Sequence, residues 1–465
     1  MSYYFISIGG TGAKVMESLT HLCIAGLLPE SERLYIAAID PDVGNGNLER
    51  TSTALNNFAV FQNFSVGNDT PLFKNKISIV RPFPWNPTGH DRTLDDLIEY
   101  HHHSKTVGKL YEVLYTQKER ATTLNEGFRG HPSIGAAVLA KNFDDASSWT
   151  TLTAQIEKTV GEGDPVKIFL AGSVFGGTGA AGLPTVARLL RNNLADYADR
   201  ISIGGVLILP YFSFTPTDTK EELFARSENF LPNTKAALKY YAERENLFDA
   251  TYFVGDSVMT PVSEFSVGSA NQRNEAHVVE LYAALAAADF FARPITAPKV
   301  FKYICRHERD KFSWSDFPTA AEDFVQFARF IFAYVHLIKP VLNDLVAGNE
   351  KPYKYPWFVD LLNGVDVTAP DVVNFNFYAE AFAAWLKQIE TLDGREVFLI
   401  DPAMFEANPA RLVDKKIFAA MDGNNSKVTL HEVWYRLTEP FKYESTVKGF
   451  GKFLRRLYDC CEIRS

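Results

Sequence analysis

The chain has 465 residues, more than a single hydrophobic core usually holds, so two domains or one large domain with an appendage are expected. Hydrophobic residues make up 46% and aromatic residues 13%, which excludes an intrinsically disordered chain. The net charge is −9 and no basic cluster is sustained, so nothing in the charge pattern indicates nucleic acid or an anionic membrane as a partner.

The four cysteines, Cys23, Cys305, Cys460 and Cys461, fit neither a disulfide framework nor a zinc site. The amino terminus leads directly into a strand-like run without the pattern of a signal peptide, and no uninterrupted apolar stretch reaches the ~18 residues that would suggest a membrane span. These features predict a cytoplasmic protein.

The amino-terminal residues have the pattern strand, glycine turn, helix. An apolar run at 4–8 ends in Gly9-Gly10-Thr11-Gly12, and apolar residues then recur at helical spacing as far as Leu22. A second buried strand is predicted at 34–39, and Asp40-Pro41-Asp42 follows it. Two strands joined by a helix in this way are expected to be parallel.

From about residue 43 to 125 the periodicity weakens into Asn-, Gly-, Thr- and Pro-rich stretches, which we interpret as an insertion. It contains His101-His102-His103. Consecutive helical residues point about 100° apart and do not converge on one ion, so a solvated polar face is favoured over a metal site.

Alternating order resumes at residue 166. The predicted elements are a strand at 166–170, a helix at 183–194, a strand at 201–209, a helix at 233–244, a strand at 250–254 and a long apolar helix at 271–293. This order is typical of an α/β fold with a Rossmann-like, mostly parallel sheet and helices on both faces. Residues 294–465 are richer in helix and aromatic side chains, which predicts a separate α-rich α+β domain.

The segment from Ala171 to Gly182 carries five glycines between a strand and a helix. Glycines let the backbone approach an anion closely, and the helix amino terminus adds a partial positive charge. No lysine stands where a G-x-x-x-x-G-K-[ST] loop requires one, and the first glycine turn lacks the G-x-G-x-x-G spacing of dinucleotide-binding folds. A phosphate-binding loop of another kind is therefore predicted.

This loop resembles that of tubulin and FtsZ, which bind GTP through a G-G-G-T-G sequence after a strand. Four further segments are similar to family motifs in the same order: the first glycine turn, Asp40-Pro41-Asp42, the segment 127–135, and Arg273-Asn274-Glu275-Ala276, which looks like the tubulin D-N-E-A sequence. The resemblance covers about residues 3 to 293. It implies nucleotide contacts by Gly9, Gly10, Thr11, Gly12, Asp40, Gly130, His131, Gly176, Gly177, Thr178, Gly179 and Asn274.

The resemblance also implies a domain organisation: a GTPase-like domain at 1–270, a central core helix at 271–293 and a divergent domain at 294–465. In the family, acidic residues after the long helix reach the nucleotide of a neighbouring subunit and orient the attacking water. Asp316 is the candidate for this carboxylate and Asp310 the alternative, and a simple helix-capping role suits Asp316 equally well.

The resemblance therefore implies a divergent prokaryotic tubulin-like protein that binds GTP or GDP with Mg²⁺, hydrolyses GTP and self-associates head to tail. The divergent carboxyl half and the predicted insertion favour an alternative, a non-polymerising nucleotide-sensing adaptor that signals to an unknown protein partner, for instance in phage defence. A Rossmann oxidoreductase is supported only by the amino-terminal glycines. The sequence does not separate guanine from adenine.

Overall fold

The structure is a computed structural model. It describes residues 1–29, 33–89, 92–102, 104–125, 127–128, 130–142, 147–214, 227–244, 247–256, 259–262, 273–294, 300–304, 311–313, 321–390, 396–398 and 430–462. Both candidates for the catalytic carboxylate, Asp310 and Asp316, lie outside the described residues.

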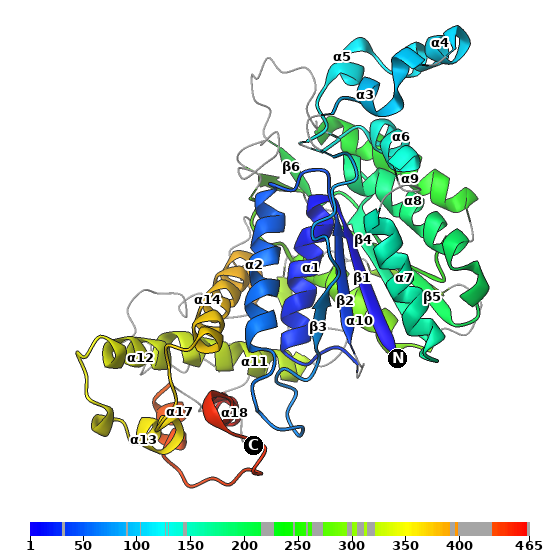
Figure 1. Ribbon diagram of the computed structural model, residues 1–465. Helices are drawn as coiled ribbons and strands as arrows, with labels where there is room; N and C mark the ends of the chain where they lie inside the picture. The colour runs from blue at the N-terminus through cyan, green and yellow to red at the C-terminus, as the bar shows by residue number, and fades with distance from the viewer. Residues whose placement is uncertain are drawn as a thin grey trace.

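A parallel sheet forms the centre of the molecule (Figure 1). Its strands, in spatial order, are β3 (Ile77–Ile79), β2 (Leu34–Ile39), β1 (Ser2–Ile8), β4 (Val166–Ser173), β5 (Ile201–Ile208), β7 (Ala250–Val254) and β9 (Val300–Ile304). Every pairing in this sheet is parallel. All residues of β1 and β4 are buried, as expected for inner strands covered on both faces.

The strand order reverses between β1 and β4. From β1 the chain moves outward through β2 to β3, whereas from β4 it moves the other way through β5 and β7 to β9. The loops that follow β1 and β4 therefore diverge toward opposite faces and leave a crevice between them, which is where doubly wound sheets bind ligands.

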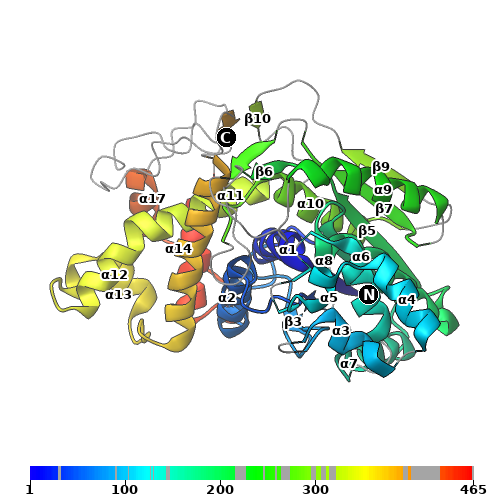
Figure 2. The ribbon, with the colours of Figure 1, turned by 90° about the horizontal axis from the view of Figure 1, so that it is seen from above.

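Helices cover both faces of the sheet, and alternate residues of β1 pack into two separate hydrophobic clusters. One face carries α1 (Gly9–Ile24), α2 (Gly46–Phe61) and α10 (Val278–Ala292). The other carries α6 (Pro132–Asn142), α7 (Ser147–Gly161), α8 (Gly177–Asn193) and α9 (Phe230–Glu243) (Figure 2). The predicted α/β fold class is confirmed.

The segment from 43 to 125, predicted to be an insertion, divides in two. Its first part belongs to the sheet domain, because α2 packs on α1 and β3 pairs with β2. Its second part, with α3 (Leu94–Ile98), α4 (Lys105–Leu114) and α5 (Gln117–Ala121), projects from the body (Figure 1). The sequence did not predict α2 because its first turn is mostly polar, although Leu48, Leu55 and Phe58 form a buried face along the helix.

The long helix predicted at 271–293 begins later than expected, at Val278. His277 and Glu280 form a capping box that fixes this start, so the segment 273–276 is not helical. The helix α8 begins earlier than predicted, at Gly177, so the last glycines of the predicted loop lie in its first turns.

The described residues of the carboxyl-terminal part are mainly helical, with a small parallel pair of strands, which confirms the predicted α-rich α+β composition. The elements are β10 (Lys311–Ser313), α11 (Ala321–Ala333), a π-helical turn (Tyr334–Ile338), α12 (Lys339–Val346), α13 (Pro356–Leu362), α14 (Pro370–Glu390), β11 (Glu396–Phe398), α17 (Leu430–Leu437) and α18 (Gly449–Cys460).

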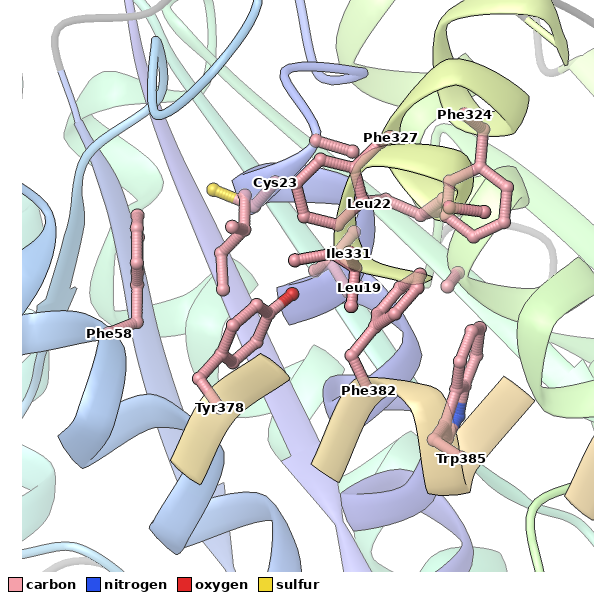
Figure 3. Packing of buried hydrophobic residues seen from close by; sticks show 14 of the residues in the cluster. Leu19, Leu22, Cys23, Phe58, Phe324, Phe327, Ile331, Tyr378, Phe382 and Trp385 are labelled. Carbon is pink, nitrogen blue, oxygen red and sulfur yellow. The ribbon is translucent and has the colours of Figure 1, made fainter. Parts of the chain in front are cut away.

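Helices α11 and α14 pack directly on α1 and α2 (Figure 3). Leu19 and Leu22 of α1 lie beside Phe327 of α11 and Phe382 of α14. Phe61 of α2 packs against Phe375 and Tyr378 of α14. The segment 323–346 is long and apolar enough to cross a membrane, but 61% of its most apolar window is buried inside the protein. Its apolar character is thus largely explained by a place in the core.

Candidate functional site

Three glycine-containing loops meet in the crevice between β1 and β4. A Cβ atom on Gly9 would lie 3.1 Å from Cβ of Thr178, so the turn after β1 touches the turn after β4. A Cβ atom on Gly177 would lie 3.0 Å from the backbone nitrogen of Gly130. The positive φ of Gly9, 74°, is one that other residues rarely adopt.

Two helices begin at this crevice without a side-chain cap. Ile8 precedes α1 and Gly176 precedes α8, and neither makes a capping hydrogen bond through a side chain. Neither helix has an acidic residue in its first turn. Their first N–H groups and partial positive charges are thus available to an anion.

A cavity lies between these helix ends, and ten of the twelve predicted nucleotide-binding residues line it. They are Gly9, Gly10, Thr11, Asp40, Gly130, Gly176, Gly177, Thr178, Gly179 and Asn274. Their side chains and backbone come from five separate segments of the chain, which the fold brings together at one edge of the sheet.

The other two predicted residues, Gly12 and His131, do not line the cavity. A Cβ atom on Gly12 would lie 2.5 Å from the carbonyl oxygen of Ala171, so this glycine lets α1 pack closely on β4. Nδ1 of His131 lies 3.3 Å from a carboxylate oxygen of Glu119, on α5.

Two acidic side chains at the end of β2 face the cavity, and both are buried. Oδ1 of Asp40 accepts a hydrogen bond from the backbone nitrogen of Asp42 at 3.1 Å, whereas Oδ2 has no partner among the described residues. Burial, and then the charge of Asp42, raise the pKa of Asp40 to about 8. An unpaired, buried carboxylate oxygen is a suitable ligand for Mg²⁺ or its bound water.

Amide side chains hold the segment before α10. Oδ1 of Asn45 accepts from the backbone nitrogen of Asn47 at 2.9 Å and caps α2. Oδ1 of Asn47 accepts from the backbone nitrogen of Asn274 at 2.9 Å, and Arg50 donates to the carbonyl oxygen of Asn274, also at 2.9 Å. The backbone of Asn274 is thereby fixed, and its side-chain amide has no hydrogen bond within the described part of the chain.

Aromatic rings form one wall of the cavity. The ring centroids of Phe175 and Phe230 lie 4.7 Å apart and those of Tyr211 and Phe212 lie 4.9 Å apart, and Phe214 completes the wall. Flat apolar rings beside a polar crevice suit a planar base or a sugar.

A buried lysine, Lys14, also lines the cavity from the second turn of α1. Its ammonium pairs with Glu280 of α10, whose Oε1 also accepts a hydrogen bond from the Tyr211 hydroxyl at 2.6 Å. Burial lowers the pKa of Lys14, and the Glu280 carboxylate opposes this shift.

Sequence reasoning placed Lys14 and Phe175 within glycine motifs but gave neither a role, and it missed the two asparagines and the rest of the aromatic wall. The asparagines fell in the predicted insertion, although Asn45-Gly46-Asn47 before an apolar period is a helix-start signal. The aromatic residues carried no distinguishing signal, because similar residues fill the core elsewhere.

A doubly wound parallel sheet with two uncapped helix starts at its switch point defines the class of Rossmann-like proteins with an anion-binding crevice. Within this class, the family model described as "Tubulin like" matches residues 4–264, more than half of the chain. The chain belongs to this tubulin-like family, as its motifs predicted.

The solved structures to which the chain is similar are distant. CetZ from Methanosaeta thermophila is 15% identical (63% of this chain, 51% of that chain, TM-score 0.26). CetZ1 from Haloferax volcanii, described as a GDP-bound monomer, is 12% identical (62% and 61%, TM-score 0.30). TubZ of Clostridium botulinum phage c-st, without its carboxyl-terminal tail, is 12% identical (62% and 59%, TM-score 0.28). This chain thus covers less than two thirds of each, and no curated protein sequence matches it.

Proposed function

We propose that the chain binds a guanine nucleotide, GTP or GDP, in the crevice between β1 and β4. The observation that carries this proposal is the convergence of two uncapped helix starts, at Gly9 and Gly177, on one cavity. Backbone N–H groups of both glycine turns would bind the phosphates. Family membership supports the proposal, and the distant relative CetZ1 is described as GDP-bound.

The other lining residues have roles that follow from their chemistry. The free amide of Asn274 offers a donor and an acceptor side by side, which suits the edge of guanine. The aromatic wall at Tyr211 and Phe230 would cover the base or ribose. Asp40 would hold Mg²⁺, which neutralises phosphate charge when bound.

Calorimetric titration with GDP, GTP, ADP and ATP tests this assignment. We expect guanine nucleotides to bind at least about tenfold more tightly than adenine nucleotides, a difference of about 1.4 kcal/mol. The Asn274→Ala variant should lose most of this preference while it keeps its affinity for pyrophosphate. Tighter binding of ADP, or no nucleotide binding at all, would overturn the proposal.

We further propose that the protein hydrolyses GTP and associates head to tail in the cytoplasm. Side chains of α4 form an exposed apolar stripe: Val107, Leu110, Val113 and Leu114 are 47%, 60%, 82% and 62% exposed. A groove lined by Met1, Pro29, Phe291 and Pro294, among others, lies beside the amino terminus. The next copy of this chain is the proposed occupant of the α4 stripe.

The placement of these two surfaces supports that pairing. Figure 1 places α4 and the amino terminus toward opposite ends of the sheet domain, and Figure 2, seen along the line between those ends, places them close together. A copy displaced along that line would bring its groove toward α4.

Sedimentation and GTP turnover at several protein concentrations test the assembly. The Leu110→Glu/Val113→Glu variant should abolish sedimentation and any rise of turnover per molecule with concentration. Lys105→Glu, on the opposite side of α4, should change both by less than about threefold. GTP binding without assembly in the unmodified chain would favour the adaptor alternative, and unchanged turnover in Asp316→Ala and Asp310→Ala would refute the proposed carboxylates.

A further inference from the structure

Lys14 is the cation of the crevice: among the described residues, no other lysine, arginine or histidine lines the cavity. Its side chain is 5% exposed and that of its partner Glu280 is 1% exposed. A lysine ammonium carries three N–H donors, yet Glu280 is the one acceptor with which it pairs in the described structure.

The neighbouring ion pair of Glu17 and Arg50 does not use Lys14 as a partner. Arg50 donates to both carboxylate oxygens of Glu17, at 2.7 and 2.6 Å, and also to the carbonyl oxygen of Asn274. Neither Glu17 nor Arg50 lines the cavity. This pair is satisfied by itself, whereas Lys14 combines donor capacity with a position on the cavity wall.

Charge balance in the cavity requires a cation of this kind. Two helix starts supply about +0.5 charge each, whereas a nucleoside diphosphate carries about −3. The cavity also contains Asp42, and Asp40 adds its negative charge once it gives up its proton to bind Mg²⁺. One bound Mg²⁺ leaves a deficit, and among the described residues only Lys14 stands ready on the wall to reduce it.

We propose that Lys14 is a phosphate-binding residue of this crevice, and that Glu280 is its counter-ion while no anion is bound. The proposal rests on the phosphate-binding part of the proposed function. When the ammonium turns to a phosphate oxygen, Glu280 loses one of its three donors. The other two are the Tyr211 hydroxyl and the backbone nitrogen of His277, which donates to Oε2 at 2.8 Å.

This exchange links phosphate binding to the start of α10. His277 is the N-cap of α10, and the guanine-contacting candidate Asn274 lies three residues before it. A change at Glu280 therefore acts on the segment that positions Asn274. By linkage, a base bound at Asn274 strengthens the phosphate contact by the same factor as the phosphate strengthens the base contact.

The test uses calorimetric titration of the full chain with inorganic pyrophosphate, GDP and guanosine. Lys14→Met should weaken pyrophosphate and GDP by about tenfold to a hundredfold and leave guanosine within about twofold, since the loss is of a charged hydrogen bond to phosphate. Lys14→Arg should retain part of the affinity. Lys76→Met replaces a half-buried lysine that does not line the cavity, and it should leave the affinity for all three ligands unchanged.

Glu280→Gln distinguishes this role from a purely structural ion pair. Release of Lys14 from its counter-ion should strengthen pyrophosphate binding by about tenfold, whereas a structural pair predicts weaker binding in both variants. The Lys14→Met/Glu280→Gln variant leaves no unpaired buried charge, and it should remain folded and weak in pyrophosphate binding. Recovery of wild-type affinity in this double variant would overturn the proposal.

The outcomes separate the two proposals. A wild-type chain that binds pyrophosphate but not GDP refutes the guanine assignment alone, and the Lys14 variants still test the phosphate contact. A wild-type chain that binds neither ligand refutes both. Equal pyrophosphate affinity of wild type and Lys14→Met refutes the role of Lys14 and leaves the guanine assignment intact.

Discussion

At the scale of single residues, two glycines of the crevice differ in what an added methyl group would meet. On Gly179 it would lie 2.5 Å from the carbonyl oxygen and 2.7 Å from the nitrogen of Ser173, both backbone atoms that cannot move aside. On Gly10 it would lie 3.2 Å from the side-chain nitrogen of Asn45, which can shift by a few tenths of an ångström.

We therefore expect Gly179→Ala to displace the first turn of α8 and weaken GDP binding by at least about tenfold, about 1.4 kcal/mol. Gly10→Ala should weaken it by less than about threefold. Titration calorimetry measures both affinities, and urea unfolding checks that both variants are folded. Similar losses in the two variants would mean that the backbone contact at Ser173 does not control the loop.

Asp40 makes stability depend on pH in an unusual direction. Its folded-state pKa is about 8, against an ordinary value of 3.8, so between these pH values the folded chain holds a proton that the unfolded chain has lost. The free energy of unfolding therefore falls as pH rises from about 4 to about 8, by at most about 1.4 kcal/mol for each pH unit crossed.

The Asp40→Asn variant should lack this decline. We expect it to be more stable than wild type at pH 8 in EDTA, by a few kcal/mol, and close to wild type at pH 4. Urea unfolding at a series of pH values measures the difference. Mg²⁺ with GDP should raise the stability of the wild type at pH 8 to that of the variant, because the Asp40 carboxylate then coordinates Mg²⁺. If the free energies of unfolding of the two proteins changed with pH in parallel, the carboxyl group of Asp40 would not be protonated in the folded chain.

At the scale of elements, α1 joins the crevice to the carboxyl-terminal helices. Nδ1 of its buried His21 lies 3.1 Å from the hydroxyl of Tyr378 on α14, and Nε2 has no partner in the described structure. Burial, and then the charge of Arg50, lower the pKa of His21 from 6.5 to about 3. The contact between α1 and α14 thus requires a neutral imidazole.

This predicts an acid-sensitive junction. Between pH 6.5 and about 3 the unfolded chain binds a proton at His21 that the folded chain excludes, so stability falls as pH falls through that window. The His21→Leu/Tyr378→Phe variant removes both polar partners, and we expect it to be near wild type at pH 7 and more stable at pH 5. Denaturant unfolding at the two pH values tests this, with Tyr378→Phe alone as the control that keeps the acid sensitivity.

The sequence predicted the elements best where periodicity and glycine turns agree. Strand β7 was predicted with its observed bounds, and the glycine turns at Gly9 and Gly176 correctly indicated the two strands whose ends form the crevice. The start of α10 was missed, because the capping box of His277 and Glu280 outweighs the helical propensity of the preceding residues.

The site was less predictable than the fold, for a physical reason. Glycine motifs reveal local backbone geometry, whereas Lys14, Asn47 and Tyr211 reach the cavity only because helices and loops from distant parts of the chain meet there. Gly12 shows the opposite case: it stands within a glycine motif that was predicted to bind nucleotide, and in the structure it makes a close contact between α1 and β4.

At the scale of the whole molecule, the sequence predicted a domain boundary near residue 294. In the structure the hydrophobic core includes residues from both sides of that position. One continuous hydrophobic cluster includes the sheet, α1, α2 and the carboxyl-terminal helices. The fully buried Tyr378, Phe382 and Trp385 of α14 rest on α1 and α2 (Figure 3). The carboxyl-terminal residues thus complete the core of the sheet domain.

A chain cut after residue 293 should therefore not fold alone. It would expose Leu19, Leu22 and Phe61, whose burial contributes about 1.5–3 kcal/mol each, against a total stability of about 5–15 kcal/mol for a typical domain. We expect the fragment 1–293 to aggregate or to unfold without a cooperative transition, and co-expression with 294–465 to restore a soluble complex that binds GDP. A fragment 1–293 that unfolds cooperatively by itself and binds GDP with the affinity of the full chain would instead establish an autonomous nucleotide-binding domain, with α11 and α14 as a covering that the crevice does not need.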